Sequence, residues 1–162
     1  MPTPRPSSAP NLGTLLFRHQ GTAFYCTRRS DRLVPGIQLR GYGPRSQLRI
    51  TTMEQTLLDI LFKPFYGGGP EVVFEAWREG VGSGNIDEER LADYLTRMSY
   101  PATTRRVGAM LAILSYVPGR ELKRTLDAGH SGFDHHAPHA RISLLPGVNY
   151  ANIDENWLVG VP

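Results

Sequence analysis

The sequence predicts an α+β fold, in which a small, mainly antiparallel sheet is formed by both chain ends and packs against four or five helices. Short β-rich runs divided by turn residues fill the first 50 residues. Apolar residues then recur at helical spacing as far as residue 128, and β-rich runs return near the end. Strands joined by short turns favour antiparallel pairing, and the closing strands are expected to extend the same sheet.

The length and composition indicate one globular domain. At 162 residues with 40% apolar side chains, such a chain buries about 70% of the surface that it exposes when unfolded. Residues 1–10 contain four prolines and two serines and predict a flexible tail, so residues 11–162 are interpreted as a single domain. The lone Cys26 excludes an intramolecular disulfide and favours the reducing cytoplasm. No apolar run approaches the ~18 residues of a membrane span.

The first 50 residues are predicted to form four short strands and carry most of the positive charge. The strands are residues 12–17, 23–26, 37–42 and 47–50. This stretch contains eight arginines and one acid, whereas residues 51–162 contain ten basic and fourteen acidic side chains. Such a surface fits phosphate backbones or an acidic partner, with an ordinary solvated surface as the alternative. The candidate contacts are Arg28, Arg29, Arg32, Arg40, Arg45 and Arg49.

The next stretch changes from a strand pattern to a helix pattern within two residues. Apolar side chains among residues 53–61 form one helical face, and Pro64 ends the helix. Thr51 and Thr52 are each followed three residues later by Glu or Gln, so either can begin the helix with a capping box. Asp59 lies too far from the first turn to gain from the helix dipole, and a side-chain partner is expected for it.

Four further helices are predicted: residues 70–79, one begun by Asp87, one capped by Thr103 or Thr104, and residues 120–128. Gly108 lies mid-helix at a cost of ~1 kcal/mol, so another backbone is expected to pack closely against it. Two arginines open the same helix, where the dipole disfavours positive charge. We therefore expect one structural ion cluster, formed by Glu54, Asp59, Arg105 and Arg106. Closing strands are predicted at residues 141–145 and 157–161.

The most site-like group of side chains is a histidine cluster beside Asp134. Neutral imidazoles at this density can bind zinc or nickel, but Gly and Pro residues place them on a loop, and their spacing matches no standard zinc motif. A solvated loop is the favoured interpretation, and no metal is expected. The weak metal candidates are His130, His135, His136 and His139.

Two other patterns resemble catalytic motifs without their context. The glycines at 67–69 lack the Lys-Ser/Thr of a phosphate loop and follow no strand, which indicates a hinge before Pro70. Asp59 with Glu121 and Lys123 has the letters of a nuclease metal site. Residues two apart on a predicted helix diverge, however, so the pair does not share a face. Neither an enzyme nor a cofactor is expected.

The capped helix carries a family resemblance. The run from Thr51 to Asp59, Thr-Thr-Met-Glu-Gln-Thr-Leu-Leu-Asp, resembles the effector domain of AbiEi-type antitoxins of abortive-infection (type IV) toxin–antitoxin systems. Members usually read Thr-Thr-Pro-Glu-Arg-Thr-Leu-Leu-Asp, so Met53 and Gln55 depart from the pattern. Later features match in order over about residues 37–162: the glycines at 67–69, the run Arg-Arg-Val-Gly at 105–108, and Asn-Trp-Leu at 156–158.

The resemblance implies a non-catalytic, cytoplasmic antitoxin that counters a nucleotidyltransferase-like toxin in phage defence. Most members also carry an N-terminal winged helix-turn-helix, which no segment of this sequence matches, so operator binding is not expected and any DNA contact is expected to be weak. Acids on exposed helix faces are the expected toxin contacts, because a basic active-site surface complements them. They are Glu75, Glu79, Glu88, Glu89 and Asp93. The alternative is a DNA-associated transcriptional regulator that uses the basic N-terminal sheet. The identity of the toxin, the mode of neutralisation and the oligomeric state stay open.

Overall fold

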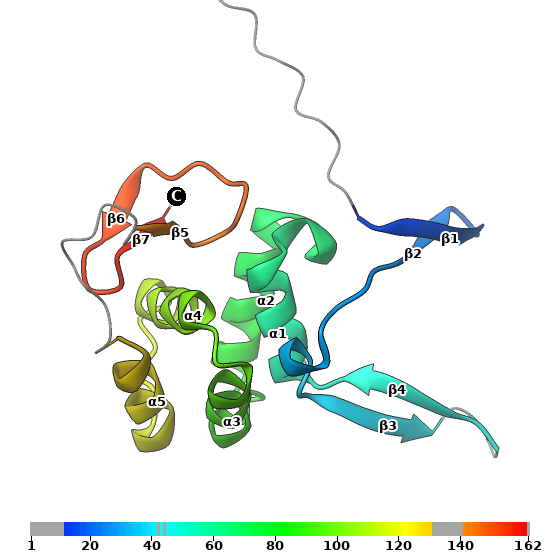
Figure 1. The fold of residues 1–162 in the computed structure, drawn as a ribbon, viewed down its shortest axis with the longest axis horizontal. Coiled ribbons are helices and arrows are strands. Elements are labelled where there is room, and N and C mark those ends of the chain that lie inside the picture. The colour runs from blue at the N-terminus through cyan, green and yellow to red at the C-terminus, as the bar shows by residue number, and fades with distance from the viewer. Residues whose placement is uncertain (1–11, 42, 44, 131–140, 162) are drawn as a thin grey trace, which may run out of the picture.

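The computed structural model describes residues 12–41, 43, 45–130 and 141–161. The predicted tail, residues 1–10, lies outside them. A helical body carries two projecting β-hairpins on one side and a small sheet on the other (Figure 1). The strands are β1 (Thr14–His19), β2 (Thr22–Cys26), β3 (Ile37–Gly41), β4 (Gln47–Thr51), β5 (Ile142–Ser143), β6 (Asn152–Asp154) and β7 (Val159–Val161). The helices are α1 (Met53–Phe62), α2 (Pro70–Gly82), α3 (Glu88–Met98), α4 (Pro101–Ile113) and α5 (Arg120–His130), with short 3-10 turns η1 (Asp31–Leu33) and η2 (Pro64–Gly67).

The α+β class and the five α-helices confirm the predicted fold class, but the strands do not join into one sheet as expected. The described strands form three separate sheets: β1–β2, β3–β4 and β5–β7–β6. The first two are antiparallel, and β5 pairs parallel to β7. The helices cause the separation, because the C-terminal sheet packs on α4 while the hairpins lie on the opposite side of the body (Figure 1).

The hydrophobic core lies within the helices and the C-terminal segment. Helix α1 contacts α2, α3 and α4, and Trp77 of α2 is fully buried with its indole N–H donating to the Leu57 carbonyl at 3.2 Å. The other fully buried large apolar side chains include Leu58, Leu61, Leu91, Met98, Met110, Leu122, Leu144 and Leu145. Among the residues described, none from β1 to β4 has a buried apolar side chain. The fold is therefore a helical core with appended hairpins.

The start of α1 resolves the two capping registers in favour of Thr52. Its hydroxyl accepts from the Gln55 N–H at 3.3 Å. The reciprocal half of a capping box is not made, since the Thr52 N–H donates to the Gly36 carbonyl at 2.9 Å instead. The helix start is thus also the point at which the β3–β4 hairpin is attached to the helical body.

The glycines before Pro70 form a turn that leads into α2, whereas the predicted cap of α4 is wrong. Gly68 and Gly69 have positive φ angles of 99° and 104°, which glycine adopts without steric cost, and Pro70 occupies the first turn of α2. In α4, Pro101 begins the helix after Tyr100, because proline with its fixed φ suits the first helical position. Both threonines predicted as caps, Thr103 and Thr104, lie inside the helix and are buried.

Gly108 makes the close contact that its mid-helix position predicts, but with a side chain. A Cβ at Gly108 would lie 2.5 Å from ring atoms of Trp157, so the close neighbour is an indole rather than another backbone. The glycine allows the segment before β7 to lie directly on α4. Across the part of the chain that the structure describes, no helix is both long enough and apolar enough to span a membrane.

Candidate interaction surface

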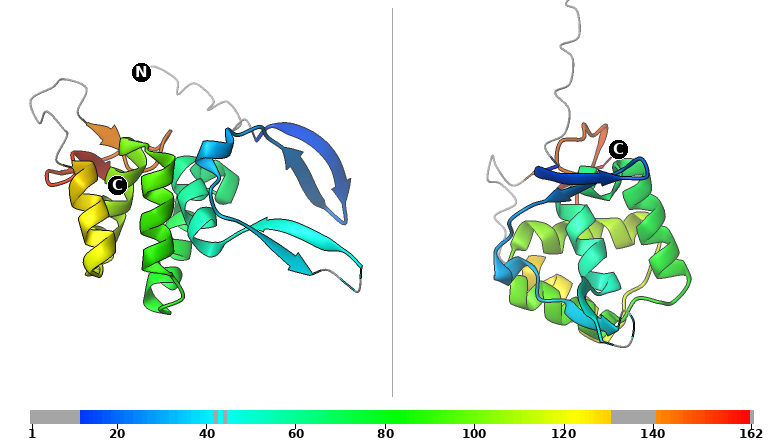
Figure 2. Two further views of the ribbon diagram at one scale, coloured as in Figure 1. Left: turned by 60° about the horizontal axis from the view of Figure 1, so that its bottom comes forward. Right: turned by 90° about the vertical axis from the view of Figure 1, so that its right-hand side faces the viewer.

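The two hairpins form an exposed surface, named here the hairpin surface and defined as strands β1 to β4. Both project from the helical body, as the left view of Figure 2 shows. Leu39 is 64% exposed and Leu16 60%, although both are leucines on strands. Phe17 and Phe24 stack on each other across β1 and β2, with ring centroids 4.5 Å apart. The other exposed large apolar residues of this surface are Leu15, Tyr25, Ile37 and Leu48.

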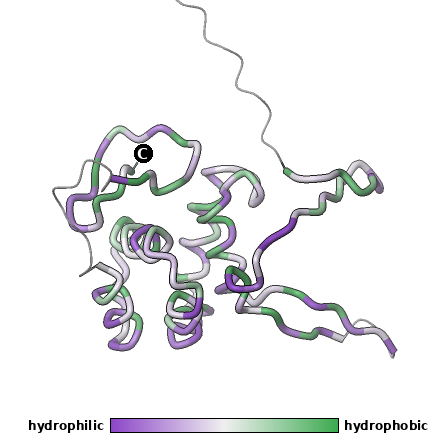
Figure 3. Tube along the Cα trace, viewed as in Figure 1, coloured by the Kyte–Doolittle hydropathy of each residue, from purple (hydrophilic) through white to green (hydrophobic). Residues whose placement is uncertain are grey.

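Such exposure indicates a surface that binds something. A two-stranded hairpin alone is marginally stable in water, because it has no third strand or helix over its apolar side chains. Contiguous exposed apolar patches on soluble proteins mark interaction sites. In the β3–β4 hairpin, where apolar and polar residues alternate (Figure 3), the strand register places Leu39 on one face and Leu48 on the other. In β1 the apolar residues Leu15, Leu16 and Phe17 are consecutive, so both hairpins carry exposed apolar side chains on both faces. The hairpin surface is therefore the strongest candidate interface in the described structure.

Gln55 and Asp59 of α1 hold the linker between the two hairpins. The Gln55 side-chain oxygen accepts from the Gly36 N–H at 3.0 Å, and its amide donates to the Leu33 carbonyl at 3.1 Å and to Asp59 at 2.7 Å. Asp59 forms an ion pair with Arg29, whose guanidinium also lies over the Phe62 ring. The expectation that Asp59 has a side-chain partner is confirmed. Because Gln55 is fully buried, these contacts fix the direction in which the hairpins leave the body.

The predicted ion cluster of Glu54, Asp59, Arg105 and Arg106 is wrong. Glu54 is 2% exposed and accepts from the backbone N–H of Asp87 at 3.0 Å, with Arg90 at 3.5 Å, so it joins α1 to the start of α3. Asp59 pairs with Arg29, as described above.

The two arginines hold the C-terminal segment instead. Arg105 donates to the carbonyls of Trp157 at 2.7 Å and Leu158 at 2.5 Å, and Arg106 donates to the Ser143 carbonyl at 2.8 Å. Burial lowers the pKa of both arginines from the ordinary value. Both side chains thus donate to backbone carbonyls in and next to the sheet that packs on α4. The predicted carboxylate partners are not their acceptors.

The candidate phosphate contacts separate into one structural residue and five exposed ones. Arg29 is occupied by Asp59 and Phe62, so it does not belong to a free basic surface. The exposed arginines are Arg28, Arg32, Arg40, Arg45 and Arg49. Three of them lie on or between β3 and β4, which makes this hairpin strongly basic.

Three of the five candidate toxin-facing acids have partners within the described chain. Glu88 is half-buried and accepts hydrogen bonds from the Tyr116 hydroxyl and from the Gly119 N–H, the latter at 2.6 Å. The hydrogen bond from the Tyr116 hydroxyl to the Glu88 carboxylate raises the pKa of Tyr116. Exposed acids also pair with arginines on their own helices: Glu75 with Arg78, and Asp93 with Arg97. Only Glu79 and Glu89 of the five are exposed without a salt bridge among the described residues.

We expect Glu88→Ala to lower the free energy of unfolding by about 1–2 kcal/mol, because the Gly119 N–H and Tyr116 hydroxyl lose a charged acceptor. Glu89→Ala, one position along α3 and exposed, is the matched control and should change stability by less than ~0.5 kcal/mol. Urea denaturation of both variants checks this. Equal stabilities would mean that Glu88 is a surface acid like its neighbour.

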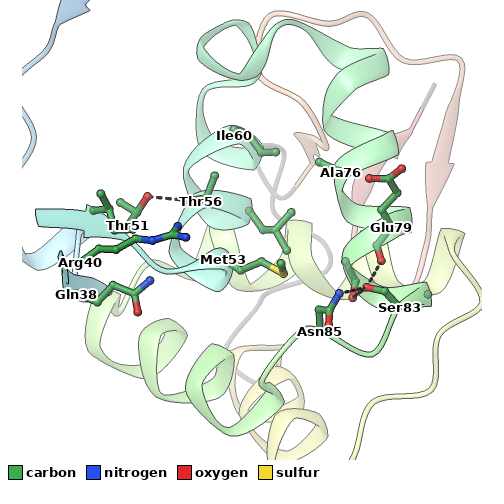
Figure 4. A pocket seen from close by; sticks show the side chains of 14 residues that line it. Gln38, Arg40, Thr51, Met53, Thr56, Ile60, Ala76, Glu79, Ser83 and Asn85 are labelled. Atoms are coloured by element: carbon green, nitrogen blue, oxygen red, sulfur yellow. Dashed lines mark hydrogen bonds between the residues drawn. The ribbon is translucent and has the colours of Figure 1, made fainter. Parts of the chain in front are cut away.

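A groove with a volume of about 820 Å³ lies between the β3–β4 hairpin and helices α1 and α2 (Figure 4). Met53, Leu57 and Ile60 contribute its apolar lining, with Arg40 on the hairpin side and Glu79 on the α2 side. The hydroxyls of Thr51 and Thr56, both in the motif that resembles the antitoxins, hydrogen bond at 2.7 Å on its wall. The remaining lining residues are Gln38, Ile50, Ala76, Gly80, Gly82, Ser83 and Asn85. An apolar floor with charged rims suits a peptide segment better than a small reactive substrate.

The nuclease-like residues do not meet, and the histidine candidates are not placed. Glu121 pairs with Arg124 on α5, whereas Asp59 pairs with Arg29. His130 ends α5, and His135, His136 and His139 lie outside the described residues. Within the described ranges, no group of three or more His, Cys, Asp or Glu side chains is arranged to hold a metal ion.

Comparison of the chain with protein-family models, with curated proteins and with solved structures finds no match.

Proposed function

We propose that this protein acts by binding another protein, as a cytoplasmic antitoxin-like protein that counters a nucleotidyltransferase-like toxin in phage defence. The observation that carries the proposal is the hairpin surface, which exposes leucines and aromatic residues, with exposed arginines on and between β3 and β4. The motif that resembles AbiEi-type antitoxins supports the same proposal. Thr52 and Asp59, which match the family pattern, attach the hairpins to the helices together with Gln55, which departs from it. The motif therefore positions the surface that we assign to the toxin.

The buried and half-buried polar groups of the motif helices make structural contacts. Glu54 joins α1 to α3 by accepting a backbone hydrogen bond, and Asp59 forms an ion pair with Arg29. Arg105 donates hydrogen bonds to the backbone carbonyls before β7. A buried charge with a structural partner stabilises one arrangement, and breaking its pair is costly. These contacts favour binding over catalysis as the role of the chain.

Rescue of growth tests the function. Co-expression of this chain should restore growth of cells that express the nucleotidyltransferase-like protein encoded next to its gene. A chain that fails to rescue while it folds and accumulates normally contradicts the antitoxin proposal. Absence of any such neighbouring gene contradicts it as well.

Two triple variants locate the contact. Replacing Leu16, Leu39 and Leu48 by serine should abolish rescue and leave the helical core intact, since none of the three is buried. Reversing Glu75, Glu89 and Asp93 to lysine should reduce rescue less, because two of these acids are already paired with arginines. Loss of rescue only in the acid variant would move the contact to the exposed faces of α2 and α3.

A second candidate function is a DNA-associated regulator, favoured by the exposed arginines of the hairpins. Binding through arginines alone should be weak, indifferent to sequence and strongly weakened by salt. Mobility-shift titration at two salt concentrations checks this. A tight, sequence-selective complex at physiological salt would favour the regulator over the antitoxin.

A further inference from the structure

The outer edge of β4 is an unpaired strand edge. Among the described residues, β4 pairs with β3 and with no other strand. The Thr52 N–H donates to the Gly36 carbonyl, while the Gly36 N–H donates to Gln55. Gly36 and Thr52 therefore occupy a hydrogen-bonded position of the ladder, with one of its two bonds made. Such pairs alternate along antiparallel strands with pairs that do not hydrogen bond. Arg49, opposite Leu39 in this register, therefore belongs to a non-bonded pair, and its backbone N–H and C=O point away from β3.

The side chains along this edge alternate in chemistry. Leu48 and Ile50 lie on one face of the hairpin, the face that borders the groove through Ile50 and Arg40. Gln47 and Arg49 lie on the other face. Because side chains of a strand alternate between faces, a strand added to β4 would need apolar residues opposite Leu48 and Ile50 and an acid opposite Arg49.

The charge of the hairpin selects among possible occupants. Residues 37–51 contain Arg40, Arg45 and Arg49 and no acid. Pairing with the same edge of a second copy would bring like charges together, which is destabilising across strands. Residues 1–11 also carry an arginine, no acid and four prolines, and proline cannot donate to a ladder. A segment of another protein in which acidic and apolar residues alternate would place an acid opposite Arg49 and apolar residues opposite Leu48 and Ile50.

We propose that the open edge of β4 binds an extended segment of a partner protein, in which acidic residues alternate with apolar ones, by adding a strand to the β3–β4 hairpin. Main-chain hydrogen bonds supply affinity in this mode of recognition, and alternate side chains supply specificity. The proposal rests on the proposed function in that the partner would be the toxin. It also gives Leu48 and Ile50 of β4 apolar neighbours on their own face of the hairpin.

The experiment uses the full chain and a short fluorescein-labelled peptide of alternating glutamate and valine, with a lysine–valine peptide as the control ligand. Fluorescence anisotropy at low salt should detect binding of the glutamate peptide only. Binding should weaken about tenfold in Arg49→Gln, which removes one charge-assisted contact. It should be lost in Arg49→Pro, which also removes the outward N–H. Proline at this position leaves the β3–β4 ladder intact, because the Arg49 N–H is not part of it.

Leu39→Pro is the matched control, since it removes an outward N–H from the opposite edge of the same hairpin. It should bind the peptide as the unchanged chain does. Hydrogen exchange of the Gln38 and Ile50 amides should show that both proline variants keep the hairpin. Equal losses in Leu39→Pro and Arg49→Pro, or no binding of the glutamate peptide, would overturn the proposal.

Other occupants give distinct results. A dimer in sedimentation that Arg49→Pro converts to a monomer would assign the edge to a second copy. If double-stranded DNA competes with the peptide for the unchanged chain and binds more tightly, the edge would be assigned to nucleic acid.

The growth assay separates this inference from the function. If Arg49→Pro rescues as well as the unchanged chain, the edge is not the toxin contact, although the antitoxin proposal stands. Peptide binding without any rescue would remove the toxin as the partner and leave the edge site in place.

Discussion

Arg105→Met is expected to lower the free energy of unfolding by about 2–4 kcal/mol. Arg105 is 3% exposed and donates to the carbonyls of Trp157 and Leu158. Hydrogen bonds to charged groups contribute ~1.5–3 kcal/mol each, and methionine removes both. Methionine keeps most of the volume and ends the desolvation cost of the guanidinium, which offsets part of the loss. The lost hydrogen bonds are therefore expected to outweigh the relief from desolvation.

Arg97→Met on α3 is the matched control, because the Arg97 side chain is 55% exposed and its ion pair with Asp93 is a surface one. Its effect should stay below ~1 kcal/mol. Guanidinium denaturation of the two variants gives the comparison, and near-ultraviolet circular dichroism reports whether Trp157 leaves its site over Gly108. Equal stabilities would show that the carbonyls before β7 are satisfied without Arg105.

Local sequence signals predicted the helices well. Threonine before Glu and Gln predicted the start of α1, Asp87 caps α3 by accepting from the Arg90 N–H, and the glycines before Pro70 form a turn. Each signal depends on neighbours within a few residues, which the sequence displays directly. The start of α4 was not predicted, because threonine hydroxyls are a capping signal at either of two positions, whereas Pro101 already suits the first helical turn and needs no such cap.

Long-range pairing was not predictable from the same signals. The position of Asp59 in its helix indicated a partner, but nothing in the sequence distinguishes Arg29, 30 positions earlier, from Arg105. Likewise, residues 12–50 read as strands of one sheet, because alternation predicts strands without their neighbours. A signal for the candidate interface was present in the consecutive apolar residues Leu15, Leu16 and Phe17, which put apolar side chains on both faces of β1. A strand with no buried face is expected to bind a partner.

Gly36→Ala is expected to detach the β3–β4 hairpin from the helices and to lower the free energy of unfolding by about 3–5 kcal/mol. A Cβ at Gly36 would lie 2.4 Å from a ring carbon of Tyr94 and 2.7 Å from the Cβ of Gln55. Tyr94 is buried, and its hydroxyl lies 3.4 Å from that of Thr52, so the ring cannot move aside freely. Overpacking of this kind costs ~1–3 kcal/mol, and loss of the hydrogen bonds that join Gly36 to Gln55 and Thr52 adds ~1 kcal/mol each.

Gly41→Ala is the control at the far end of the same strand, where an added Cβ meets nothing within 4 Å. It should be neutral or stabilise by under ~1 kcal/mol, since alanine reduces the entropy of the unfolded chain. The double variant with Tyr94→Leu should lose less than the sum of the two single losses, because the smaller side chain makes room for the Cβ. Hydrogen exchange of the β3–β4 amides beside thermal unfolding of the helices separates hairpin detachment from loss of the core. If Gly36→Ala and Gly41→Ala were equally stable and equally protected, the hairpin would not be held through Gly36. The antitoxin-like motif would then not position the interaction surface.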